Sequence, residues 1–503
     1  MNQNLFYKLA ARSRFSRPAL HVTDGATVSF GELFRQSGQV ANALVAMGVK
    51  PGDRVAVQVE KSVSALVLYL AVLRAGAVFL PLNTSYTLNE LTYFVGDAEP
   101  TVIVCDPSVE CQLVLLPGLR GVIKTLDARG SGTLTTASSS LNDEFATVTR
   151  DADDLAAILY TSGTTGRAKG AMLSHGNLIS NAETLRELWR FQADDVLLHA
   201  LPIYHAHGLF VASNVALLAG ASMWFLPRFS PDAVIDAMAH STVMMGVPTH
   251  YVRLLKHPRL RQSVQSVRLF ISGSAPLLPA THIEWATATG HAILERYGMT
   301  ETCMLTSNPY EGDRIPGSVG PAIPGVELRV VDLDTGSPLD RNEIGMIEVK
   351  GPNVFRGYWR RPEITAKEFR AEGYFVTGDL GKIDERGYLR IVGRDKDLVI
   401  TGGLNVYPRE VEAEIDAIPD VAESAVIGIE HPDFGEGVTA VIVPANGASL
   451  NEAELLARLE GRLSNFKKPK RMLFVNELPR NAMGKVQKNV LRERYKHLYT
   501  DKA

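Results

Sequence analysis

Cysteine is scarce in this sequence: Cys105, Cys111 and Cys303 are the only three in 503 residues. An odd and widely spaced set provides neither a disulfide framework nor the ligand spacing of a zinc site, so we expect a reducing, cytoplasmic location. An excess of charge is missing too, because 52 Lys and Arg residues balance 55 Asp and Glu residues to a net charge of −3. This balance argues against a surface built mainly to bind nucleic acid or an anionic membrane.

Hydrophobic runs long enough to cross a membrane are also lacking. The most apolar stretch, residues 63–82, contains Arg74 and Gly76 and meets Pro81. A membrane-spanning helix needs about 20 predominantly apolar residues. We therefore predict a buried helix followed by a strand in this stretch, and no insertion into a membrane.

The first half of the chain alternates strand-like apolar runs with amphipathic helical stretches, a pattern typical of βαβ units and parallel sheets. Beyond about residue 319, short strands separated by glycine turns indicate a smaller β-rich subdomain. Beyond residue 394, charged helices and further strands indicate a compact α+β domain. Two shorter segments also carry expectations: residues 27–33 are strand-like, and residues 131–144 are typical of a Ser/Thr-rich surface connector.

These patterns predict an α/β fold with domains of unequal size. A large N-terminal domain, residues 1–395, should contain two α/β sheet subdomains and the small β-rich subdomain. A smaller, mobile α+β domain should follow over residues 396–503. The length of 503 residues agrees with two or three domains.

Residues 160–170, YTSGTTGRAKG, carry the strongest local signal for chemistry. Backbone N–H groups freed by glycine, several hydroxyls and the cation of Lys169 are what the oxygens of a polyphosphate need. The segment is not a Walker A loop, because Ala168 and Gly170 flank the lysine. A flexible polar turn is the alternative, and the density of donors beside a cation favours a phosphate site.

This segment resembles a motif of the adenylate-forming enzymes, the superfamily of acyl-CoA synthetases, luciferases and peptide-synthetase adenylation domains. Further segments resemble the motifs of that superfamily in the same order along the chain. They are GSAPL (273–277), YGMTE (297–301), TGD (377–379), GRDKD (393–397), GGLNVYP (402–408) and NAMGK (481–485). The resemblance therefore extends over residues 160 to 485.

The resemblance implies an ATP site, and the chemistry of YGMTE agrees with it. Tyr297 offers a ring face to a purine, Thr300 a hydroxyl to a phosphoryl oxygen, and Glu301 a hard carboxylate to Mg²⁺. A carboxylate beside a phosphate is repulsive without a cation, so a metal ion is the consistent interpretation. The resemblance adds Thr165 as a second metal ligand.

Other nucleotide contacts come from the resemblance alone. Asp379 corresponds to the residue that accepts the ribose hydroxyls, and Arg394 should reach the ribose or the α-phosphate. The remaining nucleotide-binding residues that it implies are Thr161, Ser162, Gly163, Thr164, Thr165, Lys169, Gly273, Ser274, Ala275 and Lys396.

The resemblance also implies two half-reactions, between which the C-terminal domain rotates about Lys396. Lys485 should stabilise the charge that develops when a carboxylate attacks the α-phosphate of ATP, a contribution of about 2.7–4 kcal/mol for one preorganised donor. Coenzyme A would then enter along residues 402–405 and its thiol would displace AMP. A solvated lysine in a basic tail is the alternative for Lys485, and we prefer that alternative for neighbours such as Lys488.

His205 and His207 follow a strand-like segment at alternate positions, so a metal pair is conceivable. No third ligand stands at a recognisable spacing, which argues against it. The resemblance places an aromatic residue or histidine at position 205, where it lines the acyl pocket and gates thioester formation. His207 is then a candidate hydrogen-bond donor to the substrate.

Within the superfamily the chain is most similar to malonyl-CoA synthetases, over residues 199–223, 245–255, 268–278 and 478–495. A dicarboxylate keeps one free carboxylate, and burying it unpaired would cost several kcal/mol. The site should therefore contain a cation, ideally a bidentate arginine. We expect Arg253 to fill this role beside His207 and Ser274, the alternative being an arginine on a solvated helix face.

The sequence departs from the malonate pattern just after YGMTE, where TETCMLTSNP replaces the expected TETNMNTSNP. Cys303 and Leu305 remove hydrogen-bonding capacity near the acyl pocket. Methylmalonate or another small carboxylic acid therefore remains an alternative substrate. Two different functions also have to be tested: a stand-alone adenylation domain that loads a carrier protein, and a non-catalytic nucleotide-binding regulator. The sequence gives no signal for the oligomeric state.

Overall fold

Two α/β sheets make up the first part of the chain, as predicted. The computed structural model describes residues 2–23, 25–115, 119–161, 168–445, 448, 450–481 and 484–499. The first sheet has six strands in the order β6-β5-β3-β4-β7-β8, all parallel except β8. Its strands are β3 (Arg54–Gln58), β4 (Val78–Pro81), β5 (Val102–Cys105), β6 (Val122–Thr125), β7 (Leu155–Thr161) and β8 (Lys169–Ser174). The helices between them are α3 (Val63–Arg74), α4 (Leu88–Ala98), α5 (Pro107–Val114) and α6 (Thr133–Ser138).

The second sheet has eight strands in the order β14-β13-β12-β11-β9-β10-β1-β2, with antiparallel strands only at its two edges. Its strands are β1 (Pro18–His21), β2 (Thr27–Ser29), β9 (Val196–His199), β10 (Ser222–Phe225), β11 (Val243–Gly246), β12 (Leu269–Ser272), β13 (Leu294–Met299) and β14 (Cys303–Ser307). The accompanying helices are α1 (Leu5–Ala10), α7 (His175–Leu188), the π-helix η1 (His207–Ser213), α8 (Asn214–Ala219), α9 (Pro231–Met238), α10 (Pro248–Leu255), α11 (Leu260–Ser263), the 3₁₀ turn η2 (Val264–Ser266) and α12 (Pro279–Thr289). Helix α2 (Phe30–Ala46) follows β2 along the chain and packs mainly against α3 and α6.

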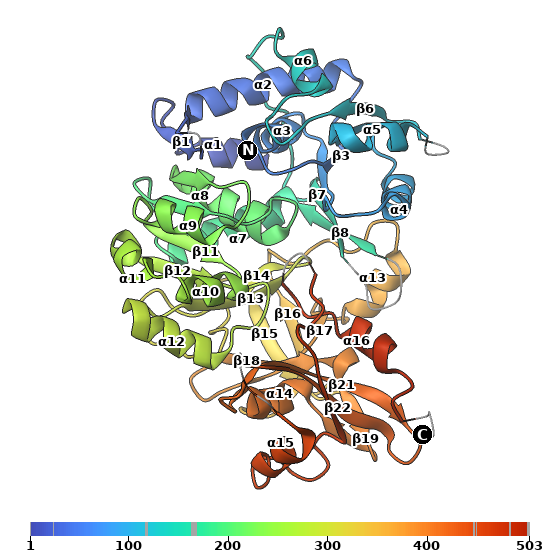
Figure 1. The fold of residues 1–503 in the computed structure, drawn as a ribbon. Coiled ribbons are helices and arrows are strands. Elements are labelled where there is room, and N and C mark those ends of the chain that lie inside the picture. The colour runs from blue at the N-terminus through green and yellow to red at the C-terminus, as the bar shows by residue number, and fades with distance from the viewer. Residues whose placement is uncertain are drawn as a thin grey trace.

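A four-stranded antiparallel sheet and a five-stranded C-terminal sheet complete the fold, and Figure 1 shows them following the two larger sheets down the molecule. The four-stranded sheet contains β15 (Glu327–Val331), β16 (Gly345–Lys350), β17 (Phe375–Ile383) and β18 (Leu389–Arg394), with α13 (Pro362–Glu368) between β16 and β17. The C-terminal part contains η3 (Asp395–Asp397), β19 (Val399–Thr401), β20 (Leu404–Val406), α14 (Pro408–Asp416), β21 (Val421–His431), β22 (Gly435–Pro444), α15 (Glu452–Arg458), β23 (Arg471–Phe474) and α16 (Lys488–Tyr495). The predicted fold class is confirmed, while the division at residue 395 stays a prediction.

The helix predicted in the most apolar stretch is α3, and it lies inside the protein. Ser62 caps its N-terminus by accepting a hydrogen bond from the backbone of Ala65, and every residue from 65 to 74 is buried. Arg74 is tolerated there because its guanidinium donates to the carbonyl of Phe34 at 2.7 Å and to the hydroxyl of Ser37 at 3.0 Å. In the described part of the chain, no helix combines the length and the apolar character that a membrane crossing requires.

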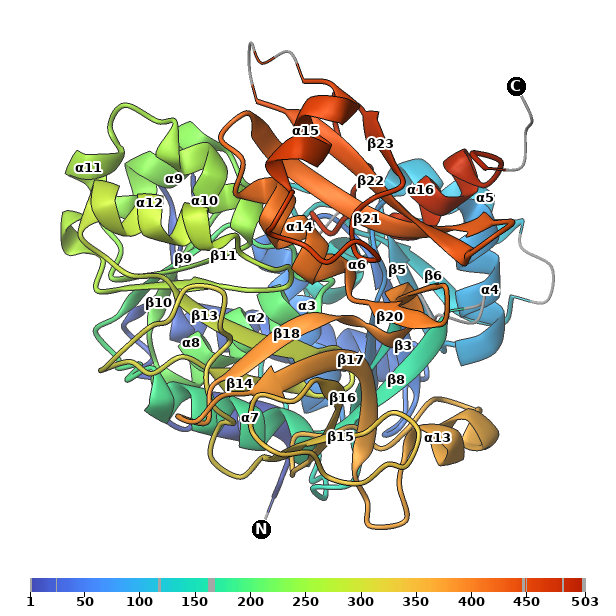
Figure 2. The ribbon, with the colours of Figure 1, turned by 90° about the horizontal axis from the view of Figure 1, so that it is seen from below.

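Two local expectations were wrong in part. The strand expected over residues 27–33 stops at Ser29, because its hydroxyl accepts a hydrogen bond from the backbone of Glu32 at 3.1 Å and begins α2. The connector over residues 131–144 contains the short helix α6. Helix α14 packs against β18, and this contact joins the C-terminal elements to the rest of the chain (Figure 2).

Candidate active site

Asp379 is the meeting point of three of the motifs. It lies on β17 directly opposite Arg394 of β18, and the Nε atom of Arg394 lies 2.9 Å from its Oδ1 atom. The hydroxyl of Tyr297 donates to Oδ2 at 2.6 Å, from 82 residues away. Burial and the negative charge of Asp379 hold the pKa of Tyr297 well above its ordinary value, so this hydroxyl stays a donor.

A second group of charges connects Lys169 with Glu301. The Nζ atom of Lys169 lies 2.6 Å from Oε1 of Glu368 and 4.2 Å from the ring centre of Tyr358. The Tyr358 hydroxyl lies 2.7 Å from Oε2 of Glu368 and 3.1 Å from Oε1 of Glu301. It has one hydrogen, so it donates to one carboxylate at a time. Burial raises the pKa of Glu301, and the charge of Glu368 adds to the rise.

Glu301 could contribute one ligand to a metal ion. It is buried, and Oγ1 of Thr161 lies 3.5 Å from its Oε1 atom. No group of three or more His, Cys, Asp or Glu side chains with metal-binding geometry occurs among the described residues. A single carboxylate suits Mg²⁺, which is usually held by one or two carboxylates together with substrate phosphates.

Part of the predicted phosphate loop lies outside the described residues, namely Ser162, Gly163, Thr164 and Thr165. The positions on either side of it are well defined, because Thr161 of β7 pairs with Lys169 of β8. The hydroxyl of Tyr93 donates to the carbonyl of Ala168 at 2.8 Å and supports the same edge. Both ends of the loop are thus fixed beside Glu301.

His207 and Ser274 form the other end of the site. Nδ1 of His207 lies 3.0 Å from Oγ of Ser274. Ser274 has a φ of +69°, a left-handed conformation that is uncommon for a residue other than glycine and is typical of functional sites. Nε2 of His207 and Nε2 of His205 are buried without a hydrogen-bond partner in the described part of the chain. Burial lowers the pKa of both histidines, that of His205 to about 4, so both rings are neutral.

Arg296, which the sequence analysis did not single out, lies beside His207. It is buried, and its Nε and Nη2 atoms have no hydrogen-bond partner among the described residues. Its charge is among the causes that lower the pKa of His207, and burial lowers its own pKa to about 9. An uncompensated buried guanidinium is costly, so the geometry fits an anion that comes from outside the chain. The available signal in the sequence was weak: Arg296 follows Glu295 and stands directly before Tyr297 at the start of β13.

Arg253 occupies a different position from the one that its predicted role suggests. Its side chain is exposed on α10, and it forms no ion pair with the part of the chain that the structure describes. It lies close enough to His250 to contribute, after burial, to lowering the pKa of that ring to about 3. Its role toward the substrate stays a prediction.

Lys485 joins the two ends of the site from the C-terminal part of the chain. Its side chain keeps contact with solvent. The protein packed around it nevertheless removes enough water to lower its pKa to about 8, and the charge of Arg394 adds to this lowering. Asp379 and Glu301 act in the opposite direction, and Lys485 in turn lowers the pKa of His205. One lysine therefore interacts with charges from the Asp379 end, the Glu301 end and the histidine end.

The loop that carries Lys485 is held from both sides. Oδ1 of Asn481 accepts a hydrogen bond from the backbone of Lys485 at 3.0 Å, and Arg480 donates to the carbonyl of Gly484 at 2.6 Å. A Cβ atom on Gly484, whose φ is +73°, would lie 3.4 Å from Thr249 of α10. The loop thus contacts the N-terminus of α10.

The other predicted residues lie where their motifs lead the chain. Gly273, Ser274 and Ala275 follow the end of β12, Thr300 lies in the turn between β13 and β14, and Lys396 is exposed in η3 just after β18. Sequence reasoning also missed Tyr358 and Glu368, which belong to no motif.

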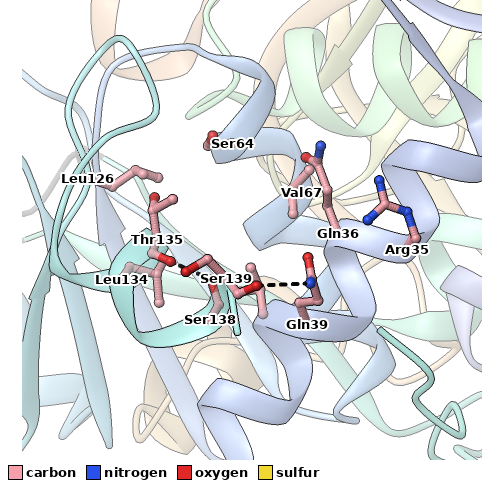
Figure 3. Close-up of a pocket in the computed structure, with 11 residues that line it drawn as sticks. Arg35, Gln36, Gln39, Ser64, Val67, Leu126, Leu134, Thr135, Ser138 and Ser139 are labelled. Atoms are coloured by element: carbon pink, nitrogen blue, oxygen red, sulfur yellow. Dashed lines mark hydrogen bonds between the residues drawn. The ribbon is translucent and has the colours of Figure 1, made fainter. Parts of the chain in front are cut away.

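A separate cavity of about 380 Å³ lies between α2, α3 and α6, and none of its lining residues belongs to a motif (Figure 3). Several of its polar side chains already have partners. Gln39 donates to the carbonyls of Ser139 and Leu141, and Thr135 donates to the carbonyl of Gly130. The cavity therefore offers no buried unpaired charge comparable with Arg296.

Comparisons with known proteins cover almost the whole chain. The family model for AMP-binding enzymes matches residues 6–359, and the model for their C-terminal domain matches residues 410–485. The feruloyl-CoA synthase of an Amycolatopsis species is 37% identical over 98% of this chain and 99% of its own length. The mitochondrial malonate–CoA ligase of Mus musculus is 36% identical over 94% of this chain and 87% of its own length.

Two solved structures are more similar in sequence to this chain than these two relatives are. ATP-bound MatB from Rhodopseudomonas palustris is 62% identical, covers 99% of this chain and all (100%) of its own, and superposes with a TM-score of 0.97. Apo MatB from the same organism, also 62% identical with the same coverage, superposes with a TM-score of 0.86. The arrangement of this chain is thus nearer to that of the ATP-bound protein than to that of the apo protein.

Proposed function

The chain belongs to the AMP-binding enzyme family, and we propose that it is an AMP-forming acid–CoA ligase that makes malonyl-CoA. Malonate, ATP and coenzyme A would give malonyl-CoA, AMP and diphosphate through a malonyl-adenylate. The mouse malonate–CoA ligase and the plant malonate–CoA ligase of Arabidopsis thaliana, 33% identical, support the choice of acid.

The buried guanidinium of Arg296 is the observation that carries this proposal. Its Nε and Nη2 atoms have no partner among the described residues, its charge lowers the pKa of His207, and the ring of His207 contacts Ser274. Malonate has a second carboxylate that stays free while the first one reacts, and this carboxylate would pair with the guanidinium. A monocarboxylic acid would leave Arg296 buried and unpaired, so its binding would lack that compensation. Arg253 stands at the surface nearby as a second candidate cation.

The first half-reaction uses the charges at the other end of the site. The purine would lie against Tyr297, the ribose hydroxyls would bind Asp379, and Arg394 would reach the α-phosphate. Glu301, together with Thr165, would hold Mg²⁺, which supplies positive charge to the phosphates. Lys485 would lie at the α-phosphorus as the malonate oxygen attacks and diphosphate leaves. This position agrees with the negative charges of Asp379 and Glu301, which both raise the pKa of Lys485.

The second half-reaction requires a different arrangement of the domains. The C-terminal domain would rotate about Lys396, withdraw Lys485 and bring residues 402–405 toward the acyl end, where His205 gates access of the thiol. The two MatB structures support such a movement, because they match this chain at the same identity with TM-scores of 0.97 and 0.86. The thiol of coenzyme A would then attack the acyl carbon and release AMP.

An acid panel tests the proposal. Release of AMP would be measured with ATP, Mg²⁺, coenzyme A and one acid at a time, comparing malonate, methylmalonate, acetate, hexanoate and ferulate. We expect the highest kcat/KM with malonate. A preference for acetate, hexanoate or ferulate would overturn the assignment of the acid. Turnover with a carrier protein but not with free coenzyme A would instead favour a carrier-loading adenylation domain.

One observation favours methylmalonate as a second candidate. Cys303 and Leu305 are buried. The side chains of Cys303 and Arg296 lie close enough for each to affect the pKa of the other. An apolar surface thus adjoins the guanidinium, where a methyl group on the acid could pack. The panel distinguishes the two acids directly.

A further inference from the structure

Lys61 is a buried amine outside the site described so far, and burial holds its pKa well below the ordinary value. It lies between β3 and α3, is 5% exposed, and forms no ion pair with a carboxylate in the described part of the chain. Its Nζ atom lies 2.8 Å from Nδ1 of His199 and 2.7 Å from the carbonyl oxygen of the same residue, and 4.2 Å from the ring centre of Phe225. Lys61 therefore joins the six-stranded sheet to the end of β9 in the eight-stranded sheet, across 138 residues.

The contacts of Lys61 determine which nitrogen of His199 carries hydrogen. Nε2 of His199 faces the carbonyl oxygen of Gly208 at 2.8 Å, and a carbonyl oxygen can only accept. Nε2 must therefore be the protonated nitrogen, and Nδ1 must accept from Lys61. Burial and the neighbouring Lys61 lower the pKa of His199 well below its ordinary value, so the ring stays neutral and keeps this tautomer.

The carbonyl of Gly208, in the first turn of the π-helix η1, is held by two side-chain hydrogen bonds. It accepts from His199 and also from the hydroxyl of Ser213, at 2.9 Å. The chain is tightly packed here, because a Cβ atom on residue 208 would lie 2.0 Å from the carbonyl oxygen of Pro202. The residue before Gly208 is His207, the first residue of η1, whose Nδ1 contacts Ser274. π-helical turns are rare and are frequent at functional sites.

We infer that Lys61 is a positioning residue for the acid substrate: through His199 it holds the Gly208 carbonyl, and thereby the orientation of His207 toward Ser274 and Arg296. The inference rests on the proposed function, since the role of His207 in binding the acid belongs to that proposal. The contacts of Lys61 in the described part of the chain are with His199 and Phe225, and neither residue belongs to a nucleotide-site motif. The hydrogen-bond network of Lys61, His199 and the Gly208 carbonyl explains why a lysine is buried here without a carboxylate, because each member orients the next.

Steady-state kinetics of Lys61→Met test the inference. Methionine keeps the unbranched stem against Phe225 and removes the donor. We expect the KM for malonate to rise about tenfold, the effect of one or two hydrogen bonds lost in a network, while the KM for ATP stays within twofold. His175→Leu is the matched control, because His175 is also buried and hydrogen-bonded, to the backbone of Leu5, and lies outside the site. In the His175→Leu variant, the KM for malonate should not rise more than the KM for ATP.

A pair of substitutions at His199 tests the next step and does not depend on the folding of the Lys61 variant. His199→Gln keeps an amide donor that can reach the Gly208 carbonyl, and His199→Leu removes it. The glutamine variant should therefore retain a malonate KM several-fold lower than the leucine variant. Equal values, or equal increases in the KM for ATP and malonate, would overturn the inference.

The wild-type acid panel separates this inference from the proposed function. If the wild type prefers another acid, the assignment of malonate fails, and the Lys61 and His199 variants are then measured with the preferred acid. If the wild type prefers malonate and the variants leave its KM within twofold, only the positioning role of Lys61 fails.

Discussion

Arg296 lies flat against the backbone of Gly273: a Cβ atom on residue 273 would stand 2.3 Å from the guanidinium carbon of Arg296. Register explains the contact, because Ser272 of β12 pairs with Glu295 of β13 and the next residue on each strand is Gly273 or Arg296. The absence of a side chain at position 273 therefore creates the space in which an arginine is buried without a partner.

Arg296→Met should abolish the preference for a dicarboxylate. We expect kcat/KM for malonate to fall about 100-fold or more, in line with the loss of a charge-assisted hydrogen bond of about 3 kcal/mol, while kcat/KM for acetate changes little. Thermal unfolding should show an equal or higher Tm, because an unpaired buried charge has been replaced by an apolar group. Arg253→Met is the control among the described arginines near the site, and a larger loss there than at Arg296 would move the carboxylate site to α10.

Lys485→Ala should separate the two half-reactions. ATP–diphosphate exchange should fall about 100- to 1,000-fold, the typical effect of removing one preorganised group that stabilises developing charge. Thioester formation from synthetic malonyl-adenylate and coenzyme A should stay within a few-fold of the wild type. Lys496→Ala, which alters an exposed lysine paired with Glu493, is the control and should affect neither step. Equal losses in both half-reactions would contradict the assigned role.

The pH dependence of adenylation should report the titration of Lys485. Its pKa is lowered to about 8, so the charged form is lost as the pH rises through that value. The kcat/KM for ATP should therefore fall about tenfold per pH unit above pH 8. Lys485→Arg, which stays protonated, should shift the fall to higher pH. A wild-type profile that is level up to pH 10 would exclude Lys485 as the titrating group.

The same lysine should affect stability with the opposite sign. Between about pH 8 and the ordinary value of 10.5, the unfolded chain binds this proton more tightly than the folded chain. The contribution of Lys485 to the free energy of unfolding therefore rises with pH in that interval. Denaturant titrations of the wild type and Lys485→Met at pH 7.5 and 10 measure it. A stability difference that moves the other way would contradict the lowered pKa.

Glu301→Gln should weaken the dependence on Mg²⁺ without unfolding the protein. The variant loses the buried carboxylate that would hold the ion, so half-maximal activity should require at least about tenfold more Mg²⁺. The repulsion between Glu301 and Glu368 also disappears, so Tm should not decrease. Tyr358→Phe, which removes the hydroxyl between the two carboxylates and leaves both in place, is the comparison. An unchanged Mg²⁺ titration for Glu301→Gln would remove this residue from the metal site.

The sequence was sufficient for the fold class and for grouping several of the motif residues, whose roles stay predictions. Tyr297, Asp379 and Arg394 were predicted in one site and do meet, because each lies in a short segment whose residue types already suit a nucleotide. Glu368 and Tyr358 could not be predicted, since they reach Lys169 and Glu301 through the path of the chain around α13.

Arg296 illustrates a different limit. The need for a buried cation was inferred from the chemistry of a dicarboxylate, but the sequence alone could not say which arginine is buried. That depends on the pairing of β12 with β13 and on the space at Gly273. The π-helix is a third case, because the apolar residues of 207–219 suit an α-helix and a π-helix equally well. In the structure the Gly208 carbonyl accepts from His199 and from the hydroxyl of Ser213, and the sequence pattern does not reveal these contacts.

The ion pair between Lys169 and Glu368 has a consequence for how anions enter this site. A phosphate that approaches Lys169 meets an ammonium group whose charge is already balanced by a carboxylate 2.6 Å away, and one of its three N–H donors is used for that contact. The gain in free energy on binding the phosphate is therefore smaller than for a bare ammonium group, because part of the positive charge is already compensated. Glu368 would therefore compete with a phosphate for Lys169 and would weaken the binding of a diphosphate that has to leave.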